Sequence, residues 1–457
     1  MKIPINASIF HDYDIRGIYP KEINEDTFFT LGRAVAAYLQ VPEIAVGFDA
    51  RLSSLSLFKA LTQGIRKQGV DVINLGQIST EIHYFASGFY KFPANIIISA
   101  SHNPPEYNGM KIVKKGVVPL HGEYGLPEIK KLALEQNFYT SHRQGKIRKI
   151  DILDQWIKHA LSFIDIKKLR PLKVVIDAGN GMAGISWKKI LGVVPCKIIP
   201  LYFKPDGCFP HHLPDPLNEE NIKDLQAKIL LEKADLGFAM DGDADRFFVL
   251  DDTGKFVSGT VTSAILSLWL LKKYGPSVIL YNAVCGRIVP ETIKKFGGTP
   301  IRVRVGHSFI KEYMKKNNAL FAGEHSGHFY FRENFYGDSS LIAGLLFLEF
   351  LSNERKSLSE IVAKIDKYPQ SGEINFKTND AKTIISAIKK KFSNAEKIDE
   401  IDGLSVFYND YWFNLRPSKT EPLLRLNLEA DTKEILRDKI KMLEGELFEL
   451  GAVKNHK

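Results

Sequence analysis

Short apolar runs alternate with helix-like segments along the whole chain. Each run is a few residues long and is bounded by polar or glycine-containing turns, which is typical of a buried strand. Three of the runs share a design, since each ends in an acidic or amide residue and is followed by a helical pattern: residues 44–49, 174–177 and 278–282. Strands that alternate with helices indicate an α/β protein, and these runs predict the opening strands of three related α/β units.

The last part of the chain has a different pattern. Its segments follow one another as strand, helix, strand, strand and helix, at residues 373–376, 381–392, 403–408 and 411–415 and in a long terminal helix. This order predicts a smaller α+β unit. Polar, charge-rich stretches separate the units. We therefore expect α/β domains over residues 1–149, 150–253 and 254–367 and an α+β domain over residues 368–457.

Composition and charge indicate which partners and which location to expect for this protein. The chain of 457 residues is 44% hydrophobic and 25% charged, and its formal net charge is +9. The positive charge is spread along the chain, so it favours an anionic small molecule over nucleic acid as the partner. Three widely separated cysteines indicate neither a disulfide framework nor a zinc site. The N-terminus lacks the apolar core of a signal peptide and the longest apolar stretches are too short or interrupted to cross a bilayer, so we expect a cytoplasmic enzyme without a membrane partner.

A polar turn follows the apolar run at residues 96–98. Residues 99–111 read Ser-Ala-Ser-His-Asn-Pro-Pro-Glu-Tyr-Asn-Gly-Met-Lys. A strand that breaks into Ser, His, Asn and two prolines would deliver the Ser101 hydroxyl to a rigid surface turn. Such a turn suits a nucleophilic or phosphate-carrying serine, although a Ser-rich loop taken alone is more often only a turn.

A run of alternating aspartates forms the second candidate site. Asp241, Asp243 and Asp245 precede Arg246, and we expect their side chains to point the same way from an extended chain. Three such carboxylates repel one another unless a cation lies among them, and oxygen-only ligands favour a hard ion such as Mg²⁺. An EF-hand calcium loop is disfavoured because Arg246 occupies the position that requires glycine. A solvated acidic turn is the remaining alternative, and the apolar flanks argue against it.

Three further stretches are weaker signals on their own. Residues 416–422, Arg-Pro-Ser-Lys-Thr-Glu-Pro, offer a guanidinium and hydroxyls on a loop stiffened by prolines, which suits a phosphate. Glu324 and Ser326 would face one side of a turn and hold sugar hydroxyls, and His328 would donate to a substrate oxygen. Residues 13–17 place an arginine at an N-terminal turn. Taken singly, these stretches are structural at least as often as functional.

Together and in this order, the five stretches resemble the α-D-phosphohexomutase superfamily and, within it, the bacterial phosphomannomutase/phosphoglucomutase group. The resemblance covers essentially the whole chain, and its most specific pair is the serine loop with the Asp-Gly-Asp-Ala-Asp-Arg loop. It implies three similar α/β domains with mixed sheets and a smaller C-terminal α+β domain, arranged around a central cleft.

The resemblance also implies residue roles. Ser101 would carry the phosphoryl group, and its phosphate would complete a Mg²⁺ site with three carboxylates, those of Asp241, Asp243 and Asp245. The other implied catalytic residues are Lys111 and His328, for proton transfer, and Arg246 and Arg16. The implied substrate-binding positions are Tyr13, His307, Glu324, Ser326, Arg416, Ser418, Lys419 and Thr420.

The implied reaction interconverts the 6-phosphate and the 1-phosphate of mannose or glucose. Phosphoserine donates to the free hydroxyl, a hexose 1,6-bisphosphate forms and turns over in the cleft, and the serine takes back the other phosphate. Mg²⁺ and Arg246 would offset charge at the transferring group. Lys111 would need cationic neighbours such as Arg16, or partial burial, to lower its pKa enough to act as a base. We expect the C-terminal domain to act as a lid, and a monomer or a weak homodimer.

Three departures from the group's pattern leave the sugar open. Val284 stands where a lysine is common, His325 where a methionine is common, and Lys419 where Asn or Gly is common. Phosphoglucosamine mutase, with a 2-amino sugar, is the nearest alternative. From other classes, a metal-dependent sugar phosphatase would release phosphate as fast as it consumes substrate, and a non-catalytic sugar-phosphate-binding protein would lack the serine or an aspartate.

Overall fold

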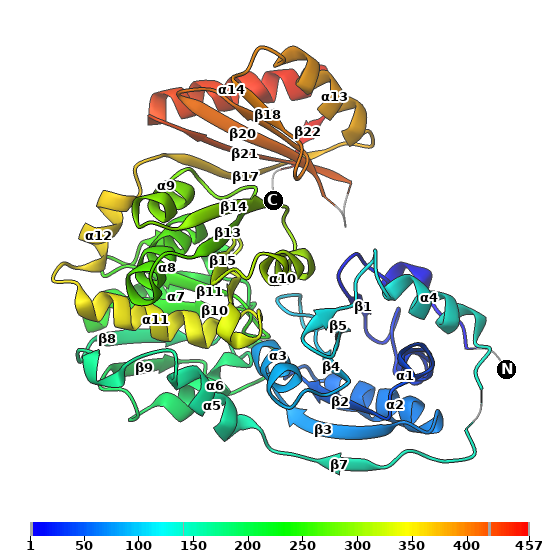
Figure 1. Ribbon diagram of the computed structural model, residues 1–457. Helices are drawn as coiled ribbons and strands as arrows, with labels where there is room; N and C mark the ends of the chain where they lie inside the picture. The colour runs from blue at the N-terminus through cyan, green and yellow to red at the C-terminus, as the bar shows by residue number, and fades with distance from the viewer. Residues whose placement is uncertain (1–2, 140, 419–421, 456–457) are drawn as a thin grey trace.

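The computed structural model describes residues 3–139, 141–418 and 422–455, and these form four units in chain order, each built on its own sheet (Figure 1). The first unit has a mixed sheet in the order β1-β5-β4-β2-β3-β7, with β6 paired to β5. Its elements are β1 Ile15–Ile18, α1 Glu25–Leu39, β2 Glu43–Phe48, α2 Ser54–Lys67, β3 Asp71–Gln77, α3 Thr80–Phe89, β4 Ala94–Ile98, β5 Tyr107–Lys114, β6 Val118–Pro119, α4 Leu126–Glu135 and β7 Ile147–Lys149, with the short 3₁₀ helix η1 Ala7–Ile9 before β1.

The second unit has a five-stranded mixed sheet in the order β12-β11-β10-β8-β9. Its strands are β8 Lys173–Asp177, β9 Lys197–Leu201, β10 Leu236–Met240, β11 Phe247–Leu250 and β12 Phe256–Val257. Its helices are α5 Leu153–Leu161, η2 Ile166–Lys168, α6 Ala183–Ile190, η3 Glu219–Ile222 and α7 Lys223–Glu232. Because β12 pairs with β11, this sheet extends past the boundary predicted at residue 253.

The third unit has a four-stranded mixed sheet in the order β14-β13-β15-β16. Its strands are β13 Val278–Asn282, β14 Thr299–Val303, β15 Phe321–Gly323 and β16 Phe329–Phe331. Its helices are α8 Gly259–Tyr274, α9 Ile288–Lys295, α10 His307–Lys316, η4 Arg332–Asn334, α11 Ser340–Asn353 and α12 Leu358–Ile365.

The fourth unit is a smaller α+β domain, as predicted. Its six-stranded sheet has the order β18-β19-β20-β21-β17-β22 and antiparallel pairing. Its elements are β17 Gln370–Lys377, α13 Ala381–Lys391, β18 Lys397–Asp399, β19 Leu404–Phe407, β20 Tyr411–Pro417, β21 Leu423–Ala430, α14 Lys433–Glu449 and β22 Val453–Lys454. Figure 1 shows this unit, coloured orange to red, at one end of the molecule beside α9 and β14 of the third unit.

The same strand arrangement occurs three times. In each of the first three sheets, an opening strand (β2, β8 or β13) has a parallel neighbour on both sides. One of those neighbours then pairs with an antiparallel strand, which gives β4 with β5, β10 with β11 and β15 with β16. The opening strands are the three apolar runs singled out in the sequence, so the prediction of three related α/β units is confirmed.

Three of the candidate motifs occupy the same turn of this repeated unit. The turn between β4 and β5 contains Ser101, the turn between β10 and β11 contains residues 241–246, and the turn between β15 and β16 contains residues 324–328. In each unit this turn connects a parallel strand to the antiparallel strand that pairs with it. The fold therefore presents three different chemistries from one structural position.

A central helix joins the first three units into one body. All but the last residue of α11 are buried, and its sequence is apolar on every side, as expected of a helix that is packed all round. The core around it continues through Phe85 of the first unit and Trp187 of the second. The fourth unit has a separate core. None of the helices in the described ranges is long and apolar enough to cross a bilayer.

Candidate active site

Ser101 lies in a buried turn between the first and second units. Its backbone has φ 51°, a left-handed conformation that is uncommon for a residue with a side chain, and its amide donates to Ser99 Oγ over 3.0 Å. Its hydroxyl donates to Asp241 Oδ2 over 2.9 Å. Only 4% of Ser101 is exposed, so its hydroxyl is buried against the loop of the second unit, whereas residues 102–106 of the turn are partly buried or exposed. The serine and the aspartate run, distant in sequence, meet as the sequence predicted.

Arg51 binds the backbone of the serine turn, and this role was not predicted from the sequence. Its guanidinium donates to four backbone carbonyls of the turn, at 2.6–3.0 Å, those of Ser101, Asn103, Pro104 and Tyr107. The side chain is fully buried, and its Nε lies 3.3 Å from Asp49 Oδ2. A planar fork with several fixed donors is what such a set of acceptors requires. The available signal was its position, two residues after a strand that ends in a carboxylate.

The three aspartates lie on a tight turn. Ala244 at the centre of the turn has φ 63°, so the prediction that an extended segment presents the carboxylates is wrong. The turn nevertheless brings carboxylate oxygens of Asp241, Asp243 and Asp245 within 4.8 Å of one another, and all three residues are buried. Gly242 lets the turn approach the serine loop, since a Cβ there would lie 2.6 Å from Ser101 O. The convergence on one point was therefore correct, although its backbone geometry was not.

The protein holds part of each of the three carboxylates through hydrogen bonds. Asp241 Oδ1 accepts from the amides of Asp245 and Arg246, at 3.2 and 3.1 Å, which leaves Oδ2 facing the Ser101 hydroxyl. Lys111 Nζ donates to Asp243 Oδ2 and Asp245 Oδ2, at 2.8 and 2.7 Å. Asp243 Oδ1 is buried without a hydrogen-bond partner, and Asp245 Oδ1 lies 3.4 Å from His328 Nε2. This is a set of convergent hard donors that fits a divalent cation.

The electrostatics of the trio also fit a cation. Burial, together with the charges of Asp245 and Asp243, raises the pKa of Asp241 well above its usual range. Arg246 and Lys111 oppose this shift without cancelling it. For Asp245, burial is outweighed by Lys111, His328 and Arg246, which hold its pKa well below its usual range. A divalent ion bound at the trio would stabilise the ionised form of Asp241.

Lys111 lies between two carboxylates of the aspartate turn. Burial disfavours its charged form, but the carboxylates of Asp243 and Asp245 outweigh burial and raise the pKa of Lys111 well above its usual value. The condition for Lys111 to act as a base, a pKa lowered by cationic neighbours such as Arg16 or by partial burial, is therefore not met. The physical reason is that strand β5 points the ammonium into the aspartate turn.

His328 and the Glu324 loop lie against the same aspartates. His328 Nε2 is 3.4 Å from Asp245 Oδ1, and its Nδ1 is 3.1 Å from Ser326 Oγ. A β-bridge between Arg246 and His328 joins the two turns. Glu324 is 1% exposed and accepts from Tyr330 Oη over 2.6 Å and from Asn282 Nδ2 over 3.2 Å. The third unit thus adds its turn to the centre formed by the first two.

Two residues of the N-terminal motif also reach this centre. Arg16 on β1 donates to Asn103 Oδ1 over 2.5 Å and pairs with Asp14, so it contacts the serine loop. Tyr13 lies beside Gly306, and its pKa is raised by burial and by the nearby carboxylates of Asp402 and Glu324. His307, another predicted position, is the first residue of α10.

The fourth unit contributes Arg416 and Ser418 from the end of β20. Arg416 Nη2 donates to Glu373 Oε2 over 2.9 Å, and Nη1 lies 3.9 Å from Asp402. Arg425 Nη2 donates to Ser418 Oγ over 3.3 Å. The predicted positions Lys419 and Thr420 lie outside the described residues. An arginine pair beside a hydroxyl is suited to an anion, at the end of the hairpin that the sequence indicated.

Two of the departures from the expected pattern, Val284 and His325, lie at the border of the third and fourth units. Val284 and His325 line a cavity of about 10 Å³ together with Trp412 and Glu429. Burial lowers the pKa of His325, so its ring is neutral at neutral pH.

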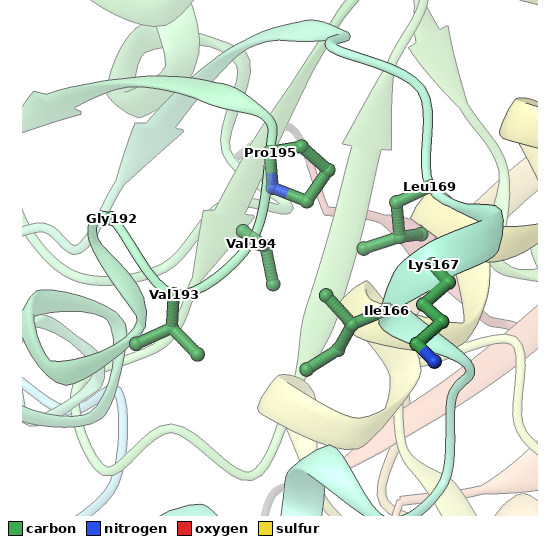
Figure 2. Close-up of a pocket in the computed structure, with 7 residues that line it drawn as sticks. All are labelled: Ile166, Lys167, Leu169, Gly192, Val193, Val194 and Pro195. Atoms are coloured by element: carbon green, nitrogen blue, oxygen red, sulfur yellow. The ribbon is translucent and has the colours of Figure 1, made fainter.

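A larger depression of about 420 Å³ lies on the second unit (Figure 2). It lies away from the aspartate turn, and its lining is mainly aliphatic, from Ile166, Leu169, Val193, Val194 and Pro195.

Comparison with known proteins agrees with this geometry. Four consecutive parts of the chain match the three alpha/beta/alpha domains and the C-terminal domain of phosphoglucomutase/phosphomannomutase, at residues 7–140, 154–254, 258–368 and 373–444. A phosphomannomutase from Methanocaldococcus jannaschii is 38% identical over 447 residues, which cover 97% of this chain and 98% of that protein. A phosphomannomutase from Escherichia coli K12 is 38% identical over 431 residues, which cover 92% and 94%.

A solved structure gives the same result for the fold. The crystal structure of a phosphoglucomutase/phosphomannomutase family protein from Burkholderia thailandensis superposes with a TM-score of 0.90 at 30% identity, covering 99% of this chain and 100% of that one. A buried serine beside a carboxylate trio, four matched domains and this superposition define a sugar-phosphate mutase fold and site. The chain belongs to the phosphoglucomutase/phosphomannomutase family and is a phosphohexomutase.

Proposed function

We propose that this phosphohexomutase interconverts the 1- and 6-phosphates of mannose and glucose through a phosphoserine at Ser101. The observation that carries the proposal is the Ser101 hydroxyl, buried and 2.9 Å from Asp241 Oδ2 at the head of the aspartate trio. A phosphoryl group on this oxygen would lie next to the free carboxylate oxygens. The mannose assignment is supported by the relatives of similar length, which are phosphomannomutases.

Asp241, Asp243 and Asp245 would hold a Mg²⁺ ion together with an oxygen of the serine phosphate. When bound, the ion supplies positive charge to the transferring group and lowers the cost of charge build-up on its oxygens. Arg246 lies 3.8 Å from Asp241 Oδ2 and adds a second positive charge on the same side. The burial of the turn keeps water from the phosphoserine.

In this proposal Lys111 supplies a fixed positive charge and His328 transfers the proton. Lys111 remains protonated between two carboxylates, so it serves as a fixed positive charge beside the transferring group. His328 accepts the proton of the attacking sugar hydroxyl, and this proton passes to the serine oxygen as its bond to phosphorus breaks in the same half-reaction. When the phosphoryl group moves back, the serine hydroxyl gives up its proton through His328 and the released sugar oxygen takes it. Ser326 and Asp245, at the two ring nitrogens, fix the imidazole plane.

Sugar binding uses the third and fourth units. Glu324 and Ser326 would contact the sugar hydroxyls, and Arg416 and Ser418 would hold the phosphate that does not react. In each half of the reaction one phosphate is transferred and the other is held, so the hexose 1,6-bisphosphate turns over between the halves. All of these residues come from one chain, and we therefore propose that a monomer or a weak homodimer is active.

Coupled assays of mannose, glucose and glucosamine 1-phosphates test the proposal, with Mg²⁺ and a trace of hexose 1,6-bisphosphate present. We expect comparable turnover of the first two sugars and slower turnover of the third. The fastest turnover with glucosamine 1-phosphate would assign the enzyme to the 2-amino sugar instead. Phosphate release equal to substrate consumption would identify a phosphatase.

A further inference from the structure

Thr80, at the start of α3, contacts the aspartate turn from the side of the first unit. Its hydroxyl donates to Asp243 Oδ2 over 2.5 Å, and its amide donates to Asp243 O over 2.9 Å. Thr80 and Asp243 are both fully buried. A single residue thus holds the backbone and one side-chain oxygen of a proposed metal ligand, across the border of two domains.

The hydroxyl determines which oxygen of Asp243 is available. Oδ2 accepts from two donors, Thr80 Oγ1 and Lys111 Nζ, whereas Oδ1 is buried with no hydrogen-bond partner. A carboxylate can rotate about its Cβ–Cγ bond and exchange the two oxygens. Two directional donors on one oxygen oppose that rotation and keep Oδ1 directed into the trio.

The position of Thr80 is itself fixed by the residue that follows it. The Glu81 carboxylate accepts from Ser339 Oγ over 2.7 Å and from the Leu341 amide over 3.1 Å, at the start of the central helix α11. The first turn of α3 is therefore held between the aspartate turn and α11. A donor on such a rigid support can impose an orientation on its acceptor.

We propose that Thr80 is a positioning residue for the metal site, which occupies Asp243 Oδ2 and thereby presents Oδ1 to the cation. The inference rests on the proposed role of the aspartate trio as Mg²⁺ ligands. It extends that proposal to a residue of another domain that touches neither the sugar nor the reacting phosphate.

Calorimetric titration of the full-length protein with Mg²⁺ tests the inference, together with thermal unfolding. Thr80→Val keeps the shape and removes the hydroxyl, so the dissociation constant for Mg²⁺ should rise about 10- to 100-fold. Thr80→Ser restores the donor and should stay within about threefold of the wild type. Thr62→Val is the matched control, because Thr62 is a buried threonine of the same unit whose hydroxyl donates to Phe58 O within α2.

The outcomes separate the inference from the proposed function. Weak Mg²⁺ binding by Thr80→Val, with tight binding by Thr80→Ser and Thr62→Val, supports the positioning role even if all three variants unfold at lower temperature. Equal Mg²⁺ affinity of Thr80→Val and the wild type would overturn the inference and leave the metal role of the aspartates standing. Absence of Mg²⁺ binding by the wild type would overturn both.

Discussion

At the scale of single residues, the site depends on a serine held in an uncommon backbone conformation. Ser101 has φ 51°, and a strained residue persists only where its surroundings fix it. Arg51 supplies that support, because its buried guanidinium satisfies four carbonyls of the turn at once. The proposed nucleophile is therefore positioned by a residue that contacts its backbone and not its hydroxyl.

Arg51→Lys tests this support. A lysine keeps the charge but lacks the planar fork, so several buried carbonyls lose their donors. We expect a loss of about 3 kcal/mol in stability and a decrease in kcat of about 10- to 100-fold, with little change in KM. Thermal unfolding and steady-state kinetics measure the two effects. A variant with normal kcat would show that the serine turn keeps its shape without the guanidinium.

The sequence indicated the residues of the candidate site more readily than the residues that hold them in place. Ser101 and the three aspartates stand out because their residue types and spacing are unusual outside a site. Arg51 and Thr80 are ordinary in sequence, and only the three-dimensional contacts reveal their partners. The raised pKa of Lys111 could not be predicted for the same reason, since its carboxylate partners lie more than a hundred residues away.

At the scale of elements, the start of α3 meets the start of α11 at one buried carboxylate. Burial raises the pKa of Glu81 to about 7, and hydrogen bonds from Ser339, Leu341, Ser186 and Ser340 oppose the shift only in part. The folded-state pKa lies above the unfolded value of about 4.3. The unfolded chain therefore binds fewer protons between these values, and stability falls as pH rises through that window.

Glu81→Gln removes this titration. Relative to the variant, the wild type should lose on the order of 3 kcal/mol of stability between pH 5 and pH 8. Urea unfolding of both proteins at the two pH values measures the difference. A stability difference that does not change with pH would show that Glu81 keeps one protonation state throughout.

A second element-scale junction joins β21 of the fourth unit to the start of α9. Glu429 is 1% exposed and accepts from Arg287 Nε over 2.8 Å, from Gln370 Nε2 over 3.0 Å and from Trp412 Nε1 over 2.9 Å. Gln370 begins β17, where the chain enters the fourth unit. One carboxylate thus ties that unit to the third.

Glu429→Gln should loosen this junction and move Arg416 relative to the Glu324 loop. We expect KM to rise about tenfold, with a smaller change in kcat, because the fourth unit is proposed to hold the non-reacting phosphate. Asp431→Asn is the control, since Asp431 contacts the same arginine at a partly exposed position and should leave KM within about twofold. Equal effects of the two changes on KM would contradict the assigned role of Glu429.

At the scale of the whole molecule, one α/β unit is used three times with different chemistry at the same turn. The sequence predicted the three opening strands, because an apolar run that ends in a polar residue is a local signal. The equivalence of the three functional turns was not predicted, since the strands that flank them are short and their loops differ in length and composition. The fold class could be predicted from the hydrophobic pattern and the family resemblance, whereas the core that the first three units share around α11 is visible only in the structure.

Metal binding should stabilise the whole molecule, because the proposed ion links the loop of the second unit to the serine of the first. At Mg²⁺ concentrations a hundred times the dissociation constant, the linkage is worth about 2.7 kcal/mol. We expect chelation to lower the unfolding temperature and abolish activity, and Mg²⁺ to restore both. An Asp243→Asn variant should not respond to Mg²⁺, and a response equal to that of the wild type would place the ion elsewhere.

The central claim is that Ser101 carries the phosphoryl group that is exchanged with the sugar. Peptide mass spectrometry of the protein after incubation with hexose 1,6-bisphosphate and Mg²⁺ tests it most directly. The account predicts one phosphoryl group, on the peptide that contains Ser101, which disappears when excess unphosphorylated sugar accepts it and is absent from the inactive Ser101→Ala variant. A phosphoryl group on another residue, or a Ser101→Ala variant that isomerises hexose phosphates at the wild-type rate, would contradict it.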